Sequence, residues 1–333
     1  MLAVLAVLAA VPGGCATFED PTIVLDLRVI GMTAEPPEQV VELDLSKPPR
    51  PVELIDQLGP TYVCAHLADP AEPRELRWSM TACLLDLDSR CDPARPQVFL
   101  GEGVLGDPEL VPDGGKACSL IEYDADLGGW IALLSNAIQG DPTRGLGGVD
   151  YAVELRVGGE SAPRALDVFG VKQARISARI PDAKVANHNP TLADLQLSRS
   201  SGISNSAPRR RCADSTSGGP AFSARSGETI TLYPLEPEAG LEPPVREEFI
   251  VPTLDGGFEK YTEVLTYQWL GGGGTFVDPI TGGPPDVFGN QTLLGTDWIA
   301  PAVGGSTLIP VWVIQRDERF GGSVRETCIR VLP

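Results

Sequence analysis

The sequence predicts an all-β chain, with two β-sandwich domains in tandem after a signal peptide and one short helix in the first domain. Its 333 residues include 37 Gly and 31 Pro, and both residue types interrupt regular helices. Apolar and polar residues alternate over short runs, which is the period of a half-buried strand. Because 333 residues exceed what one hydrophobic core usually organises, we expect two domains.

The first residues predict export. Residues 2–11 are an uncharged apolar run, far shorter than the roughly 20 residues of a membrane-spanning helix. The following Pro-Gly-Gly-Cys15 resembles a bacterial lipobox, in which small residues before the cysteine admit a lipoprotein signal peptidase. This resemblance implies a signal peptide over residues 1–14, lipidation of Cys15 and a tether over residues 15–22.

The segment departs from the lipobox pattern at two points. Pro12 stands where Leu or Val is usual, and no Lys or Arg follows Met1. The alternative is a signal peptide cut near Gly14, with Cys15 as an ordinary thiol. Lipidation implies a location in the cell envelope, as an outer-membrane lipoprotein facing the periplasm or the cell surface, with the anchor as the contact to the membrane.

The charge of the chain is strongly negative. Its 45 acidic residues against 26 basic residues give a formal net charge of -19. This charge repels phosphate and makes nucleic acid an unsuitable partner.

The cysteine count predicts disulfides in an oxidising compartment. Seven cysteines are present, and an even number remains once Cys15 is set aside. The candidates are Cys64, Cys83, Cys91, Cys118, Cys212 and Cys328. Cys83 and Cys91 are expected to close one loop, which leaves Cys64 with Cys118 in the first domain and Cys212 with Cys328 in the second. Six thiols allow many pairings, so the individual partners stay open. Their spacing does not fit a zinc site, and no metal or cofactor is predicted.

The first domain is expected over residues 23–181. Its strands are predicted at 23–30, 40–45, 61–67, 76–80, 150–157 and 164–180. Pro36 and Pro37 close the first strand, because proline lacks the N–H that a ladder needs. Apolar residues recur at helical intervals over 128–138 before Pro142, which predicts the short helix.

The second domain is expected over residues 187–333. Its opening segment 187–190, Asn-His-Asn-Pro, predicts a turn. A long loop rich in Ser, Gly and Arg is expected over 198–220. Strands are predicted at 192–197, 229–233, 263–269, 297–300, 307–316 and 324–331.

Ordered motifs of the second domain resemble an immunoglobulin-like domain of the PKD or bacterial Ig-like kind. The motifs are Tyr267-Gln-Trp269, the segment 273–276, Trp298-Ile-Ala-Pro301, the segment 311–317 and Gly321-Gly322. The resemblance implies that Trp269 fills the space between two sheets and that Asp317 with the glycines forms the last hairpin. The bulkier insert 318–320 departs from that hairpin.

The mature chain also resembles uncharacterised surface lipoproteins of myxobacterial type. The segments that carry this resemblance are 27–37, 187–190 and 312–317. It implies architecture and location, and it carries no activity.

The candidate catalytic residues are few. A serine hydrolase needs a histidine base, and the chain has two histidines and no GxSxG turn. His66 lies on an alternating strand, where a satisfied structural residue is expected, and His188 lies in the turn between the domains. No catalytic residue is predicted.

Other motifs have a structural explanation that fits better than a functional one. The glycines 271–274 fit a hairpin, because no Lys-Ser/Thr follows as in a phosphate loop. The segment 86–92 fits a solvated, disulfide-closed turn, because it lacks the Gly and the Glu of a calcium loop. Arg209, Arg210 and Arg211 fit a solvated cluster.

We therefore expect a non-enzymatic, lipid-anchored envelope protein that acts as a structural or protein-interaction (adhesin-like) module, with an envelope or cell-surface protein as partner. Trp78, Trp269, Trp298 and Trp312 are expected to fill the cores. The alternative is a protein that binds or hydrolyses polysaccharide at the envelope. Buried Trp130 and Trp298 would count against that alternative, because a sugar platform needs an exposed indole face.

Overall fold

The computed structural model describes the chain from residue 20 to residue 333, apart from residues 44–45, 48–49, 71–74, 106–115, 143–144, 146, 160–165, 182, 192–193, 200–201, 203, 208–211, 213–221, 237–245 and 254–256. The described residues are mostly β-strand. The predicted signal peptide, the lipidation site Cys15 and the cluster Arg209–Arg211 lie outside the described residues.

The first half of the chain forms two sheets that share one core. Its strands are β1 (Arg28–Glu35), β2 (Glu38–Val41), β3 (Thr61–Ala68), β4 (Leu76–Cys83), β5 (Val98–Leu105), β6 (Lys116–Ile121), β7 (Val149–Gly159) and β8 (Val168–Ala178). One sheet has the order β1-β3-β6 and the other has the order β2-β8-β7-β4-β5. The inward residues of both sheets, such as Val63, Met80 and Leu155, are fully buried in this core.

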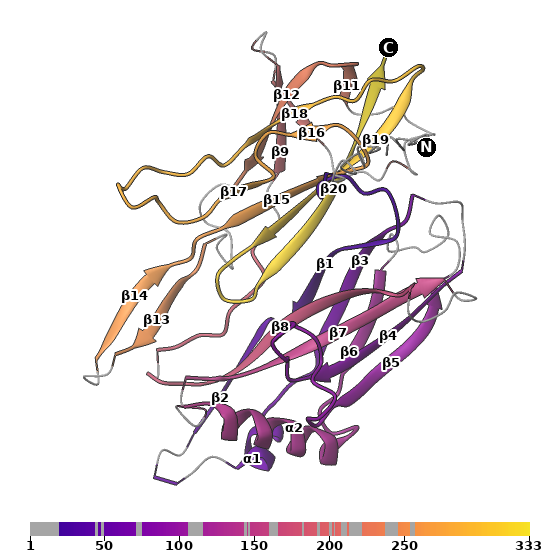
Figure 1. The fold of residues 1–333 in the computed structure, drawn as a ribbon. Helices are drawn as coiled ribbons and strands as arrows, with labels where there is room; N and C mark the ends of the chain where they lie inside the picture. The colour runs from indigo at the N-terminus through magenta and orange to yellow at the C-terminus, as the bar shows by residue number, and fades with distance from the viewer. Residues whose placement is uncertain are drawn as a thin grey trace, which may run out of the picture.

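Two helices cover the end of the first half that lies away from the second half (Figure 1): α1 (Pro51–Ile55) and α2 (Leu127–Gly140). The Asp126 carboxylate caps α2 by accepting a hydrogen bond from the Gly129 N–H at 3.0 Å. Trp130 and two leucines of α2 are buried in the core of the first half. The expectation of a single helix was wrong, because α1 is one turn of five residues and too short to show helical periodicity.

The second half also forms two sheets, with an additional hairpin. Its strands are β9 (Asp194–Arg199), β10 (Ser204–Ala207), β11 (Phe222–Arg225), β12 (Thr229–Leu235), β13 (Glu248–Pro252), β14 (Phe258–Thr262), β15 (Thr266–Gly271), β16 (Thr275–Phe276), β17 (Ile280–Gly282), β18 (Thr296–Ile299), β19 (Thr307–Arg316) and β20 (Gly322–Leu332). The sheets have the orders β10-β9-β12-β18-β16 and β11-β20-β19-β15-β17, and β13 and β14 form a separate two-stranded sheet. β10 lies inside the segment that the sequence predicted as a loop.

The two halves repeat one strand order. In the three-stranded sheet β1-β3-β6 and in the corresponding strands β9-β12-β18, each strand is antiparallel to its neighbour. In the opposite sheets, β2-β8-β7-β4-β5 corresponds to β11-β20-β19-β15-β17. The first strand of each of these sheets, β2 or β11, runs parallel to the last strand of its half. The chain therefore builds the same topology twice.

The core of the second half is organised by two tryptophans. Trp269 and Trp298 are fully buried, as predicted. The indole N–H of Trp269 donates to the Thr281 hydroxyl at 2.9 Å, and that of Trp298 donates to the Gly273 carbonyl at 3.1 Å. Both polar tips are therefore satisfied inside an apolar core.

A third apolar cluster joins the two halves. The register of β1 shifts between Val29 and Gly31, and Ile30 at this bulge packs against the outer face of the second half. On that face it meets Trp312 and Ile314 of β19. Trp312 is thus buried in the junction and not in the core of the second sandwich, which corrects the expectation from the sequence.

The segment before β1 belongs to the same junction. The first strand was predicted at 23–30 but begins at Arg28. Ile23 instead forms a parallel bridge with Gly271 at the end of β15, and the Val24 N–H donates to the Gly271 carbonyl at 2.9 Å. Residues 23 and 24, which were assigned to the first domain, therefore also contact the second half.

Three disulfides are described, two in the first half and one in the second. They join Cys64 to Cys118, Cys83 to Cys91, and Cys212 to Cys328. The first pair links directly opposite residues of β3 and β6. The sequence left the individual partners open, and the pairs found agree with the short loop expected for Cys83 and Cys91 and with the remaining pairs expected in each half. No described disulfide links the two halves.

Candidate functional site

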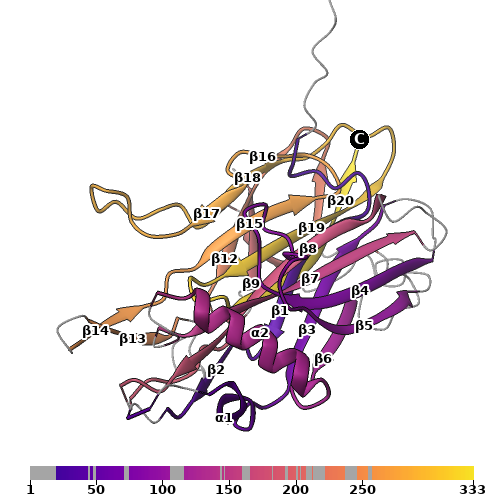
Figure 2. The same ribbon diagram turned by 60° about the horizontal axis from the view of Figure 1, so that its bottom comes forward.

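The most exposed apolar side chains of the second half lie in the loop between β17 and β18. Val287 is 94% exposed and Phe288 is 86% exposed. Figures 1 and 2 both show this loop extending away from the sandwich. Two neighbouring apolar side chains that both stand in solvent form a small exposed apolar patch, so this loop is the first candidate for an interaction surface.

The tip of this loop is a hydrogen-bonded turn. The Asp286 carboxylate accepts hydrogen bonds from the backbone N–H of Phe288 at 2.8 Å and of Asn290 at 2.9 Å. The Asn290 side-chain amide donates to the same carboxylate at 2.8 Å. The hydrogen bond from the Asn290 side chain is the main cause that lowers the pKa of Asp286, and the hydrogen bonds from backbone N–H groups lower this pKa further. These hydrogen bonds restrain the backbone of the turn, and the side chains of Val287 and Phe288 project from it into solvent.

A second turn of the same design lies in the first half. The Asp86 carboxylate accepts hydrogen bonds from the N–H of Asp88 at 2.9 Å and of Arg90 at 3.0 Å, and Cys83–Cys91 closes the turn. The carboxylate thus binds backbone amides, in agreement with the predicted disulfide-closed turn. Within the described residues, no group of three or more His, Cys, Asp or Glu could hold a metal ion. This turn exposes one apolar residue, Leu87, between two aspartates.

The hairpin of β13 and β14 extends on the same side of the molecule as the β17–β18 loop (Figures 1 and 2). The rings of Phe249 and Tyr261 stack across it with centroids 5.6 Å apart. Phe258 is 54% exposed and Val251 is 39% exposed. The hairpin is thus a second projection with exposed aromatic surface, separate from the candidate loop.

Arg319 fixes the base of this hairpin to the first half. Its guanidinium donates to Glu38 of β2 at 2.7 Å and to Glu263, directly after β14, at 3.2 Å. The Glu247 carboxylate, directly before β13, lies 3.5 Å from the same guanidinium. All three carboxylates are buried. One cation therefore connects the first half with the hairpin.

The carboxylates in this cluster have opposite pKa shifts. Burial would raise the pKa of Glu38, but the hydrogen bond from Ser177 and the charges of Lys184 and Arg319 lower it overall. Burial is the main cause that raises the pKa of Glu263 to about 7. The cluster thus contains a carboxyl group that titrates near neutral pH.

The turn residues predicted between the domains also join the cluster. The backbone N–H of Asn187 donates to Glu38 at 2.9 Å, and the Asn187 side chain donates to Asp317 at 3.1 Å. His188 Nδ1 lies 2.7 Å from a Glu247 carboxylate oxygen. The sequence predicted the turn but not the cluster, because its carboxylates come from distant segments.

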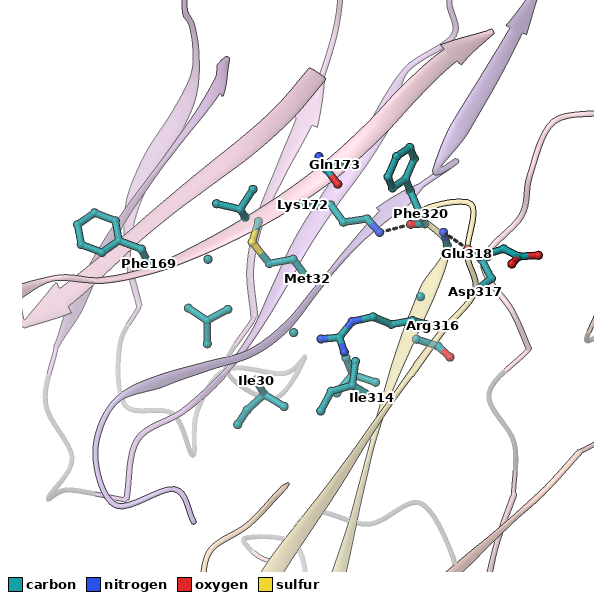
Figure 3. A pocket seen from close by; sticks show the side chains of 18 residues that line it. Ile30, Met32, Phe169, Lys172, Gln173, Ile314, Arg316, Asp317, Glu318 and Phe320 are labelled. Atoms are coloured by element: carbon teal, nitrogen blue, oxygen red, sulfur yellow. Dashed lines mark hydrogen bonds between the residues drawn. The ribbon is translucent and has the colours of Figure 1, made fainter. Parts of the chain in front are cut away.

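A pocket of about 460 Å³ lies between the halves, lined by β1, β8 and the β19–β20 hairpin (Figure 3). Lys172 of β8 and Arg316 of β19 line it together with apolar residues such as Met32. Burial is the main cause that lowers the pKa of Lys172 to about 8. No local sequence pattern announces this pocket, because its walls are far apart in the chain.

Trp78, which was expected to fill the core, is only partly buried: it packs against the core of the first half and lines a second pocket with Glu102 and Asp167. His66 and Trp130 have structural surroundings. Burial, followed by the charge of Lys116, lowers the pKa of His66 to about 4, so this imidazole is neutral at neutral pH. Trp130 is buried against the rings of Tyr123 and Tyr151, at centroid distances of 4.6 and 5.4 Å. Trp130 and Trp298 therefore offer no exposed indole face to a sugar.

Comparison with known proteins assigns no family. No family model and no curated protein matches the chain. The similarity to solved structures is weak, as three of them illustrate. Red sea bream transglutaminase is 10% identical over 81% of this chain and 29% of its own, with a TM-score of 0.20. The two tandem V-type regions of VCBP3, a v-region-containing chitin-binding protein, are 9% identical over 91% and 99%, with a TM-score of 0.24. Native E. coli alpha-2-macroglobulin is 9% identical over 92% and 17%, with a TM-score of 0.22. At these TM-scores the similarity identifies neither family nor activity.

Proposed function

We propose that the protein is a non-enzymatic, lipid-anchored envelope protein that acts as a protein-interaction (adhesin-like) module of two immunoglobulin-like domains. The repeated topology supports the domain proposal. In each half, three antiparallel strands face a second sheet. The second sheet contains the last two strands of the half, and a short strand at its edge runs parallel to the last one. Two facing antiparallel sheets with these connections are the general plan of an immunoglobulin-like sandwich.

The observation that carries the functional proposal is the exposed pair Val287 and Phe288. Both side chains stand at the tip of a turn that Asp286 fixes with two backbone hydrogen bonds. Because the hydrogen bonds restrain the backbone of the turn, binding costs less backbone conformational entropy, and the burial of the two apolar side chains contributes to affinity. An aromatic residue at a loop end is a typical anchor in protein interfaces.

The chemistry of the loop favours a protein partner over a lipid surface. Residues 277–295 contain no Lys or Arg, and the chain has a net charge of -19. Interfacial membrane binding usually combines apolar residues with basic residues that attract anionic lipids. We therefore propose an apolar pocket on an envelope or cell-surface protein as the site that receives Phe288.

The proposed anchor is Cys15. The three disulfides support export to an oxidising compartment. No helix within the described residues is long and apolar enough to cross a membrane. Replacing Cys15 by Ser should convert a detergent-extracted protein into a soluble one or into an unprocessed precursor. Fatty-acid labelling of the variant at the wild-type level would contradict the anchor.

The binding proposal is tested with immobilised residues 20–333 and detergent-solubilised envelope fractions from cells that carry the protein. We expect saturable retention of protease-sensitive components by the wild type, lost after Val287→Ser with Phe288→Ser. Leu87→Ser is the matched control, because Leu87 stands on a turn of the same design. Equal retention by the double variant would overturn the proposal. Retention that resists protease but is abolished by glycosidase would favour the polysaccharide alternative.

A further inference from the structure

The strand β5 is an open edge of the first half. It is the last strand of the order β2-β8-β7-β4-β5, and Figures 1 and 2 show it at the border of its sheet. Main-chain N–H and C=O groups of an edge strand point away from the sheet at alternate positions. Within the described residues, the Ser119 hydroxyl donates to the Leu100 carbonyl at 2.8 Å, and no hydrogen bond from outside the β4–β5 pair reaches the backbone of residues 101–105. This part of the edge can therefore pair with another strand.

The sequence of β5 lacks the features that usually protect an edge. Protected edge strands are short or contain Lys or Pro, whereas β5 has eight residues and contains no Lys, Arg or Pro. Its outward side chains include Phe99 and Val104, which are 62% and 53% exposed. The β-bulge of this strand lies at Leu100, so it does not interrupt the segment 101–105.

The second half shows what covers the equivalent edge. β17 corresponds to β5 in the repeated strand order, but it has three residues. Residues 292–294 of the same chain lie along it and run antiparallel to it. The hydrogen bonds run from the Gly282 N–H to the Leu293 carbonyl at 2.7 Å, from the Thr281 hydroxyl to the Leu294 carbonyl at 2.7 Å, and from the Thr292 hydroxyl to the Gly283 carbonyl at 3.1 Å. The second half thus covers with its own chain an edge that the described part of the first half leaves open.

Two adjacent hollows lie on the sheet beside β5. Their volumes are about 400 and 300 Å³, and both are lined by Ser79, Glu102 and Arg156. Val104 lines the first hollow, and Phe99 lines the second. Because the side chains of a strand alternate between two faces, every second side chain of a strand added to β5 would lie on the side of these hollows.

The charges around the hollows favour a basic partner residue. Arg156 pairs with Glu154 at 2.9 Å, and Arg77 pairs with Asp167 at 2.8 Å. Glu102 has no ion pair or hydrogen bond in the part of the chain that the structure describes. Opposite charges on neighbouring strands stabilise their pairing, and like charges that face each other destabilise it. A second copy of the chain, paired antiparallel about Glu102, would place two Glu102 side chains opposite each other.

We propose that β5 binds an extended segment of a partner protein as an added antiparallel strand, with a Lys or Arg beside Glu102 and apolar residues beside Phe99 and Val104. Main-chain hydrogen bonds give the affinity of such a complex, and alternate side chains in pockets give its specificity. The inference rests on the proposed interaction function and adds a second surface, which is separate from the β17–β18 turn of the other half.

The proposal is tested by calorimetry on residues 20–333 with an acetylated and amidated heptapeptide, Thr-Val-Thr-Lys-Thr-Val-Thr. We expect saturable binding. Methylation of alternate main-chain nitrogens gives two further peptides, one of which loses the N–H groups that face β5. That peptide should bind at least tenfold more weakly, whereas the other should bind like the parent peptide. Equal affinities of the two methylated peptides would contradict strand addition.

Charge reversal tests the position of the peptide. Glu102→Lys should weaken binding of the heptapeptide about fivefold and should strengthen, to a similar extent, binding of the same peptide with Glu in place of Lys. Glu259→Lys is the matched control, because Glu259 stands on the exposed strand β14, and it should bind both peptides like the wild type. No saturable binding of the heptapeptide, or an unchanged preference in Glu102→Lys, would overturn the proposal.

Hydrogen exchange of the wild type locates the bound peptide, which should slow exchange within residues 101–105. A dimer of the peptide-free protein in which these amides are already protected would assign the edge to a second copy and would also overturn the proposal. Val287→Ser with Phe288→Ser should leave heptapeptide binding unchanged. The β5 edge and the β17–β18 turn can therefore each fail its test without the other.

Discussion

Gly31 of β1 and Val324 of β20 approach so closely that a Cβ on Gly31 would lie 2.9 Å from Val324 Cγ2. Real Cβ atoms do not come this near to another carbon, so this contact between the halves requires glycine. Together with the apolar cluster around Ile30, it makes the junction a packed interface rather than a flexible linker.

Gly31→Ala should therefore destabilise the protein by about 1–3 kcal/mol, because the added methyl overpacks the junction. Denaturant unfolding measures this change. Gly304→Ala is the matched control, because a Cβ there meets nothing within 4 Å. If Gly31→Ala were as stable as Gly304→Ala, the junction would have room for the added methyl group, and the claim that it is closely packed would be wrong.

Replacing Arg319 by Met should cost about 3 kcal/mol or more, because Glu38, Glu247 and Glu263 would lose their shared cation while remaining buried. The free energy of unfolding at neutral pH measures the loss. Arg95→Met is the control, since Arg95 forms only a half-exposed surface pair with Asp92. Similar small losses in both variants would refute the connecting role of Arg319.

Glu263→Gln should change how stability depends on pH. The pKa of Glu263 is about 7 in the folded protein against an ordinary 4.5, so its protonation stabilises the fold fully below about pH 4.5. This contribution is lost as the pH rises through 7. The Gln side chain does not titrate, so the free energy of unfolding of the variant minus that of the wild type should rise by roughly 2 kcal/mol between about pH 5 and 8. A difference that does not vary with pH would contradict the raised pKa.

The disulfides should contribute according to the loops that they close. Cys212–Cys328 spans 116 residues and should stabilise by about 4–5 kcal/mol in the chain-entropy model, whereas Cys83–Cys91 spans 8 residues and should give about 2–3 kcal/mol. Paired Cys→Ser variants measure both values. Non-reducing peptide mapping that links a cysteine before residue 181 to Cys212 or Cys328 would contradict the division of the chain.

Strands with a buried face were predictable from the sequence, and exposed ones were not. The apolar run of β19 was predicted at 307–316, the bounds that the structure has. β14 was missed because all five of its residues are exposed and no alternation marks a buried face. Trp312 was assigned to the wrong cluster because β19 is buried on both faces, and its sequence does not tell which face meets which core.

The sites differ in the same way. Val287 and Phe288 stand among Pro, Asp, Gly and Asn, so an apolar pair inside a turn motif was a signal that sequence reasoning could have used. The Arg319 cluster joins Glu38 to Glu263, and the junction pocket joins Met32 to Lys172 and Arg316. Such contacts depend on how the two halves pack, and no local pattern contains that information.

The central claim is that the β17–β18 turn contacts a partner protein, and site-specific photocrosslinking in intact cells that carry the protein tests it most directly. A photoreactive phenylalanine analogue is placed at Phe288 and, as the control, at Leu87, which is at least as exposed and stands on a similar turn. We predict discrete, protease-sensitive adducts from position 288 that the Leu87 position does not give. Absent adducts at position 288, or the same adducts from both positions, would contradict the claim.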